Sequence, residues 1–473
     1  MYFWINIILL IIYFVVVISC VVVVVSENKN PIRALSWTLA LLFLPLIGVI
    51  FYLFFGRSLK GKAMVSRKVR RKLLEKSRPK QHSFDNAGLN ADQIQKVKLA
   101  HNLCHAHLDR NNSVEIFTDG QSKFKRFKED IKNAKDFILI QYYIYNDDRL
   151  GNEILDLLAE KAREGVVVKV LYDHVGSFST KNIFFARMRQ LGIDCHPFFR
   201  VTFRKLANRI NWRNHRKIAI IDGEVGYIGG MNIADRYVET SPEGRIWRDT
   251  HLRVQGPVIE SMLYSFSVDW NFLRPASDIE PISARKYEGN GNVDMQLVTS
   301  GPIDKWNNLV LCFQQAIASA RKRIYIQTPY FLPTDALLKA LQGAALSGVD
   351  VRIMIPEKTD SILLGFGSRS YIDDCLKAGV KIYQFLPGML HAKTMIIDDD
   401  FVTTGSVNFD FRSFENNFEA NLLIYSEDVN RRMRDIFFQD LQFSQKLTLS
   451  QWRKRPTFEK TMEALVRLFS PIL

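Results

Sequence analysis

The stretch that decides the interpretation of this chain is HRKIAIID, residues His215–Asp222, because a second copy, HAKTMIID, follows at His391–Asp398. Both copies read His-x-Lys-x4-Asp, and an asparagine follows each histidine at the same interval of seventeen residues, as Asn232 and Asn408. A single His-x-Lys pair lies more often on a solvated strand end than in a functional site. Two copies with the same trailing asparagine predict a duplicated site.

Each copy predicts a buried strand that ends in a tight turn, because apolar residues follow the lysine and stop at Asp-Gly or Asp-Asp. Alternate residues of a strand point to the same face, so the histidine and the lysine of each copy project together. A second short strand, 225–228 or 401–404, returns towards the starting end. We therefore expect Asn232 and Asn408 to lie near the two His-Lys pairs.

An imidazole, an ammonium group and a carboxamide that converge on one point suit a phosphate group. Lysine supplies a point charge, asparagine supplies N–H donors, and histidine can attack or transfer a proton near neutral pH. Two facing sets would supply a nucleophile, an acid/base partner and a cradle for the oxygens, with no metal or cofactor. The candidates are His215, Lys217, His391 and Lys393 for catalysis, and Asn232, Asn408 and Ser406 for phosphate binding.

Four acidic residues complete the candidate site. Asp222 and Asp398 belong to the motif, but they lie at the far end of the strand beside a turn, which favours a structural role over a direct chemical one. Both alternatives stay open at this point. Asp249 and Glu419, each just ahead of a strand-like run, are better candidates for orienting the histidine rings. A carboxylate bonded to the far ring nitrogen would fix the tautomer and stabilise imidazolium.

At these residues the chain resembles the phospholipase D superfamily, whose mark is the paired His-x-Lys-x4-Asp motif, over roughly 114–424. The resemblance implies two α/β/α sandwich halves with mixed sheets around a shared site, and a covalent phosphohistidine intermediate. It also implies that His215 is the nucleophile and His391 the general acid/base, although the residues themselves leave that order open. One departure is that Gly230 stands where the second copy has Ser406, so the halves cannot contribute identical hydroxyl donors.

The duplication extends well beyond the two motifs. Strand-like segments at 137–143 and 323–330 each lead to a helix-like segment, a glycine and another strand, which predicts two similar α/β halves packed face to face. The segment 275–292 is rich in Pro, Ser, Gly and Asn and predicts the boundary. We therefore assign 113–280 to the first half and 281–473, with a C-terminal amphipathic helix that packs on the domain, to the second.

The composition fits a two-domain protein with an anionic partner. The chain has 473 residues and a net charge of +15, which predicts binding to nucleic acid or to an anionic membrane surface. Its five cysteines are scattered without a Cys-x-x-Cys pair, which favours a reducing compartment over a disulfide framework or a zinc site. Four possible metal ligands lie close together in the sequence: His101, Cys104, His105 and His107. No further set of ligands to complete a metal site is obvious elsewhere in the chain, so we expect no metal at this cluster.

Two apolar runs, 2–25 and 34–55, are each long enough to cross a bilayer and predict a membrane hairpin over 1–56. Pro45 and Gly48 either kink the second run or make it re-entrant. The basic linker and helix that follow, 57–112, begin with a run rich in lysine and arginine. The positive-inside rule therefore predicts a multi-pass cell-membrane protein whose catalytic region lies in the cytoplasm.

The first half is longer than the second just before its histidine. His215 follows Gly192 by twenty-three positions, whereas His391 follows Gly379 by twelve. The extra residues mix aromatic side chains with arginines, which fits either contact with a lipid interface or an amphipathic segment that covers the core. The residues favour neither alternative.

The hairpin, the basic run and the two motifs together resemble bacterial cardiolipin synthases within the superfamily, along nearly the whole chain. That resemblance implies transfer of a phosphatidyl group between two phosphatidylglycerol molecules with release of glycerol. The expected partners are phosphatidylglycerol and anionic membrane lipid, and not nucleic acid; the oligomeric state stays open. The alternatives are action on another phospholipid, a nuclease of the same superfamily, and a catalytically silent lipid-binding scaffold. The predicted spans argue against a nuclease, and the complete set of site residues argues against a scaffold.

Overall fold

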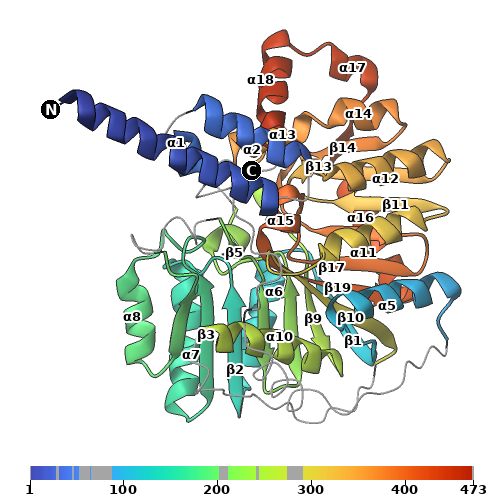
Figure 1. Ribbon diagram of the computed structural model, residues 1–473. Coiled ribbons are helices and arrows are strands. Elements are labelled where there is room, and N and C mark those ends of the chain that lie inside the picture. Colours follow the sequence, from blue (N-terminus) through green and yellow to red (C-terminus); the bar gives the residue numbers. More distant parts are fainter. Residues whose placement is uncertain are drawn as a thin grey trace.

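The computed structural model describes residues 2–27, 31–44, 47–52, 64, 88–201, 211–240, 244–273 and 291–470. Two similar α/β halves lie side by side, the first in green and teal and the second in yellow to red (Figure 1). Their strands form one continuous mixed sheet in the order β20-β14-β13-β11-β16-β17-β19-β10-β1-β9-β7-β6-β2-β3-β4. The expected duplicated α/β architecture is confirmed, but the halves do not pack face to face: they join edge to edge in a single sheet, because β1 of the first half pairs with β10 of the second. The exact boundary stays a prediction, because 274–290 lies outside the described residues.

In the first half, the central strand β2 (Phe137–Tyr142) pairs in parallel with β3 and antiparallel with the motif strand β6 (Ile218–Ile221). The remaining strands are β1 (Asp109–Phe117), β3 (Val167–Asp173), β4 (Asp194–Phe198), β7 (Val225–Gly229) and β9 (His251–Gln255). One face is covered by α6 (Gly120–Lys132), α7 (Arg149–Arg163) and α8 (Asn182–Gln190), and the other by α10 (Val258–Phe272).

The second half repeats this pattern: β11 (Arg323–Gln327) pairs in parallel with β13 and antiparallel with the motif strand β16 (Thr394–Ile397). The other strands of its sheet are β10 (Val293–Ser300), β13 (Asp350–Pro356), β14 (Lys381–Phe385), β17 (Phe401–Gly405), β19 (Asn417–Tyr425) and β20 (Ser444–Lys446). Its helices are α11 (Asn308–Ala318), α12 (Asp335–Leu346), α13 (Ile362–Arg369), α14 (Ile372–Lys377), α15 (Phe411–Glu415), α16 (Glu427–Gln442), α17 (Leu449–Arg453) and α18 (Thr457–Leu468).

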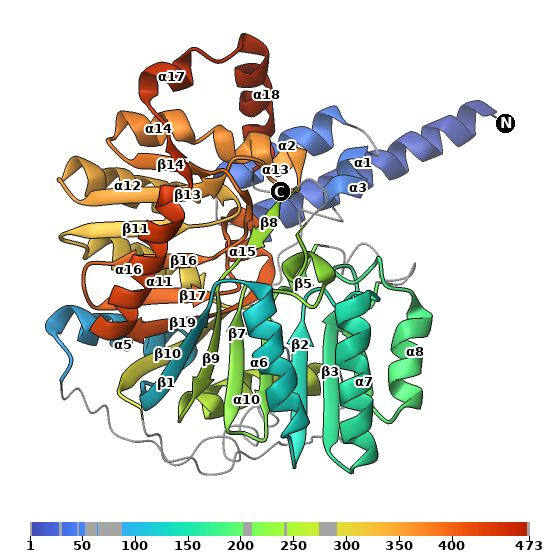
Figure 2. The same cartoon turned by 180° about the vertical axis from the view of Figure 1, so that it is seen from behind.

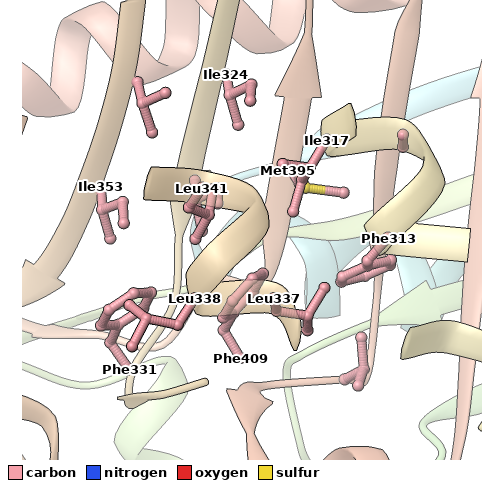
Figure 3. Packing of buried hydrophobic residues seen from close by; sticks show 14 of the residues in the cluster. Phe313, Ile317, Ile324, Phe331, Leu337, Leu338, Leu341, Ile353, Met395 and Phe409 are labelled. Atoms are coloured by element: carbon pink, nitrogen blue, oxygen red, sulfur yellow. The ribbon is translucent and has the colours of Figure 1, made fainter. Parts of the chain in front are cut away.

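Apolar packing fixes these layers. Figure 3 shows α11 and α12 against the sheet of the second half, where Phe313, Leu341 and Met395 meet. Helix α5 (Ala91–Cys104) joins the same cluster through Val97 and Ala100. Full burial of such a side chain contributes roughly 1.5–3 kcal/mol. On the opposite face, one shared core contains residues of α10 and α16 together with strands of both halves, so the halves form a single body.

The N-terminal region confirms one long apolar helix but not the predicted pair of spanning helices. Helix α1 (Tyr2–Glu27) is mostly exposed, and its residues 2–24 are long and apolar enough to cross a membrane. The second run is divided into α2 (Pro31–Phe43) and α3 (Ile47–Phe51). A Cβ atom on Gly48 would lie 2.5 Å from the Ala40 carbonyl oxygen, so α3 turns back against α2. A proline at position 45 cannot donate the backbone hydrogen bond that a continuous helix needs.

The N-terminal helices lie at the level where the two halves meet. In both views α1 and α2 lie beside the junction, and α1 extends away from the body (Figures 1 and 2). The short elements β5 (Arg213–Asn214) and β8 (Ile246–Arg248) lie at the same junction. The predicted basic run at 57–80 lies outside the described residues except for Met64.

Candidate active site

Each motif histidine is held in place by the opposite half. Strand β5 pairs in parallel with the start of β19, and the His215 N–H donates to the Phe418 carbonyl at 2.9 Å. In the same way β8 pairs with β15 (Gly388–Leu390), and the His391 N–H donates to the Arg248 carbonyl at 2.7 Å. Because backbone hydrogen bonds cross the junction twice, both histidines lie at the interface of the two halves.

The carboxylates that orient the imidazole rings are also exchanged between the halves. His215 Nδ1 lies 2.9 Å from Glu419 Oε1, and His391 Nδ1 lies 2.7 Å from Asp249 Oδ2. Sequence analysis selected both acidic residues but gave no pairing between them and the histidines. With Nδ1–H directed at a carboxylate, the Nε2 of each ring keeps a lone pair that can attack phosphorus or accept a proton.

The charge of each motif lysine reaches the histidine of the other motif copy. Lys217 Nζ donates to the His215 carbonyl at 2.6 Å, and Lys393 Nζ donates to the His391 carbonyl at 2.5 Å. Lys217 also lowers the pKa of His391, and Lys393 lowers the pKa of His215. Each lysine thus acts on the histidine of the other copy, as expected if the two sets surround one phosphate.

Burial favours the neutral form of both imidazoles. It lowers the pKa of His215 to about 4, with Glu419 opposing the shift and Lys217 adding to it. The pKa of His391 is lowered well below its ordinary value by burial and by Lys393. A bound phosphate would bring negative charge and so favour the imidazolium form that an acid step requires.

The two carboxylates differ in their surroundings. Burial raises the pKa of Asp249 to about 6, although Lys393 opposes this shift. Burial also acts to raise the pKa of Glu419, but His215 and Lys217 outweigh it and leave that pKa lowered. Glu419 is therefore the more strongly anionic partner, whereas Asp249 can share a proton with its histidine near neutral pH.

The one visible departure between the motif copies has a steric cause. Ser406 Oγ donates to Glu419 Oε2 at 2.5 Å, so this hydroxyl supports a carboxylate in the structure. At the equivalent position, a Cβ atom on Gly230 would overlap with the carboxylate oxygens of Asp249. The shorter aspartate thus occupies the space that a serine side chain would need.

The two asparagines lie beside the site but have different partners. Asn232 Oδ1 accepts from the Ile144 N–H at 3.1 Å, and its Nδ2 donates to Tyr237 Oη at 3.0 Å. Tyr237 Oη lies 3.4 Å from His391 Nδ1, so this tyrosine links the asparagine to the ring. Asn408 Oδ1 is buried and accepts no hydrogen bond from the part of the chain that the structure describes. Sequence reasoning missed Tyr237, because Ser413 replaces it in the second copy.

The motif aspartates lie at the opposite end of their strands and bind backbone. Asp222 accepts the amides of Lys135, Asp136 and Phe137 at 2.8 to 2.9 Å. Asp398 likewise accepts hydrogen bonds from three backbone amides: Lys322 at 2.7 Å, Arg321 at 2.9 Å and Arg323 at 3.0 Å. Both carboxylates thereby fix the start of the neighbouring strand, which supports the structural alternative for these two residues.

A second layer of buried acids binds arginines next to the histidines and their carboxylates. Asp269 Oδ2 lies 2.6 Å from the Arg216 guanidinium, and Asp440 Oδ2 lies 2.7 Å from that of Arg248. Sequence reasoning did not find this pair, because neither acid lies in a repeated motif. The described aromatics of the longer segment before His215 are buried against Phe418, which favours core packing there. Residues 202–210 of that segment lie outside the described residues.

Comparisons with known proteins agree with this geometry. The protein-family model described as "Cardiolipin synthase, PLD-like domain" matches residues 127–261 and 313–441. A second family model, described as "Phospholipase_D-nuclease N-terminal", matches residues 8–57. The chain is 40% identical over 460 residues to the major cardiolipin synthase ClsA of Bacillus subtilis, covering 94% of this chain and 95% of that protein. It is also 40% identical to a cardiolipin synthase of Listeria monocytogenes, with the same coverage of both chains.

A solved structure, phosphatidylserine synthase of Haemophilus influenzae, shares the fold with a TM-score of 0.61 at 15% identity, over 80% of this chain and 100% of that one. Two repeated α/β halves with paired His-x-Lys sets at their junction define a phospholipase D-like protein. Within that class, the chain belongs to the cardiolipin synthase family.

Proposed function

We propose that this protein transfers a phosphatidyl group from one phosphatidylglycerol molecule to another, which yields cardiolipin and glycerol. The observation that carries the proposal is the crossed pairing of each motif histidine with a carboxylate of the other half at the junction. One phosphodiester replaces another, so the reaction needs no nucleotide. Family membership and 40% identity to curated cardiolipin synthases over nearly the full length support the assignment.

In the first step, His215 Nε2 attacks the phosphorus of the donor lipid, and the bond between phosphorus and the glycerol oxygen breaks. His391 gives its Nε2 proton to the leaving glycerol. Lys217, Lys393 and Asn408 hold the phosphate oxygens, and Glu419 stabilises the positive charge that develops on the nucleophilic ring. The strongly anionic character of Glu419 supports this order of the two histidines.

In the second step, a terminal hydroxyl of the acceptor lipid attacks the phosphohistidine. His391 takes the hydroxyl proton, a new P–O bond forms and the P–N bond to His215 breaks. Asp249, whose pKa is raised to about 6, stabilises the imidazolium form of His391 before the first step and after the second. The enzyme returns to its starting protonation state.

The membrane supplies the acceptor. Helix α1 is a candidate span beside the junction of the halves, so it would hold the site against lipid rather than nucleic acid. A site at the membrane surface meets a second lipid at high effective concentration, which favours lipid over water as acceptor. The proposed topology keeps the catalytic region in the cytoplasm, as the basic residues after position 56 suggest, with α2 and α3 as a re-entrant element in the same bilayer.

The direct test is to incubate the purified full-length protein with phosphatidylglycerol vesicles and identify the products by mass. We expect cardiolipin and glycerol in equal amounts, and no cardiolipin with the His215→Ala variant. Phosphatidic acid as the only lipid product would show a hydrolase instead. Release of nucleotides from DNA, without any lipid product, would show a nuclease.

A further inference from the structure

The two halves share one more pair of residues beside the site, which the motif does not include. Arg236 follows Asn232 by four residues, and Arg412 follows Asn408 by the same interval. The two arginines therefore occupy equivalent positions on opposite sides of the junction. Arg236 lies on the His391 side, because its charge lowers the pKa of that histidine. Arg412 lies on the other side, where its charge opposes the rise that burial causes in the pKa of Tyr143, whose ring contacts His215.

Two other arginines around the site already have carboxylate partners. Arg213 pairs with Asp173 at 3.3 Å, and Arg216 pairs with Asp269 at 2.6 Å. Arg236 has no such partner: no residue within the described ranges accepts from its guanidinium or forms an ion pair with it. A buried Nε without an acceptor is a feature that Arg236 shares with Arg213, but Arg213 also has its carboxylate.

Aromatic rings hold this unpaired guanidinium in place. It lies 4.7 Å from the ring centroid of Trp247 and 5.7 Å from that of Tyr237, and both rings also contact His391. By contrast, Arg412 donates to the Asn211 carbonyl at 3.2 Å. A fixed cation whose donors are unused is suited to an anion that arrives with the substrate.

The proposed reaction requires such an anion site on one side only. The glycerol that leaves in the first step and the glycerol that enters in the second occupy the same place, next to the acid/base histidine. The donor lipid has no further charge there, whereas the acceptor lipid carries its own phosphodiester one glycerol length beyond the attacking hydroxyl. The acid/base histidine is His391, and the unpaired arginine beside it is Arg236.

We propose that Arg236 binds the phosphodiester of the acceptor lipid and thereby selects an anionic lipid over water or a neutral alcohol. The inference rests on the proposed function and adds a second anion subsite to it. It predicts that loss of the guanidinium weakens transfer to phosphatidylglycerol far more than transfer to an acceptor without a phosphate.

Free glycerol is such an acceptor, because its attack on the phosphohistidine regenerates phosphatidylglycerol. The test measures two rates for each full-length variant in phosphatidylglycerol vesicles: formation of cardiolipin, and incorporation of labelled glycerol into phosphatidylglycerol. We expect Arg236→Gln to lower the ratio of the first rate to the second by roughly 10- to 100-fold, the effect of a lost hydrogen bond to a charged group. The conservative Arg236→Lys should restore part of the ratio.

The matched control is Arg412→Gln, which removes the equivalent guanidinium from the other half and should leave the ratio as in the wild type. Glycerol incorporation also reports that the site is folded in each variant. The proposal is overturned if Arg236→Gln lowers both rates equally or neither of them, or if Arg412→Gln produces the same drop in the ratio. Failure of the wild-type protein to show either rate would instead overturn the proposed function.

Discussion

The exchanged carboxylate of Glu419 gives the sharpest prediction. In the Glu419→Gln variant, the Ser406 hydroxyl can still donate to the amide oxygen, and the amide N–H then faces His215 Nδ1 and displaces the Asn417 amide that donates to Oε1 at 3.2 Å. The ring must then accept at Nδ1 and carry its proton on Nε2, where it cannot attack phosphorus. The variant also loses the negative charge that stabilises imidazolium during transfer.

The expected loss follows from these contacts. A buried hydrogen bond to a charged group contributes about 1.5–3 kcal/mol, and the unfavourable tautomer adds to that cost. We therefore expect the rate of phosphoenzyme formation to fall roughly 10²- to 10⁴-fold, which corresponds to about 3–5 kcal/mol. The measurement is a rapid acid quench with phosphatidylglycerol labelled at its phosphate, followed by counting of protein-bound label.

The control is Glu427→Gln, the same substitution at an exposed position, which should form phosphoenzyme at the wild-type rate. A Glu419→Gln variant that forms phosphoenzyme within about threefold of the wild-type rate would refute the assignment of His215 and Glu419 as the nucleophilic pair. Label that maps to His391 alone would refute the order of the two histidines.

Three further predictions concern residues in or next to the two motifs. The pKa of His215 is lowered to about 4 in the folded state, so the unfolded state binds a proton at a higher pH than the folded state does. The free energy of unfolding should therefore decrease as the pH falls from about 6.5 towards 4. In denaturant titrations, His215→Asn should show a smaller decrease over this window, and an unchanged decrease would refute the lowered pKa. Asp222→Ala leaves three backbone amides without their acceptor and should lower the free energy of unfolding by about 3 kcal/mol or more, whereas lost activity at unchanged stability would reveal a direct chemical role. Gly230→Ala should abolish activity, because the added Cβ would displace the carboxylate of Asp249. The control is Gly343→Ala, which should be tolerated because an added Cβ there meets nothing within 4 Å. Equal activity of the two variants would contradict the steric argument.

Local patterns predicted most of the fold, because they are written in short stretches of sequence. The strands around 137–143 and 323–330, the helices that follow them and the two motif strands all appear as β2, β11, α7, α12, β6 and β16. Each of these elements carries its own hydrophobic period and its own turn signals. The repeat then required two similar halves, and their packing brought the two histidines together.

The parts that could not be predicted depend on contacts between distant positions. The pairing of His215 with Glu419 spans 204 residues, and that of His391 with Asp249 spans 142, and nothing in either local sequence specifies the partner. The course of the second apolar run stayed open for a different reason, although Pro45 and Gly48 predicted an interruption in it. Hydropathy measures only whether a segment prefers lipid, and it does not report where a chain reverses direction.

The exchange of carboxylates between the halves also bears on how such a site can change over time. If two identical subunits paired in this way, both imidazoles would have the same surroundings and neither could specialise. Joining the subunits into one polypeptide removes that constraint, since a substitution then alters one side alone. The differences between Glu419 and Asp249, and between Ser406 and Gly230, are of this kind. They give the two rings unequal proton affinities, so a division of labour between attacking group and proton carrier becomes heritable.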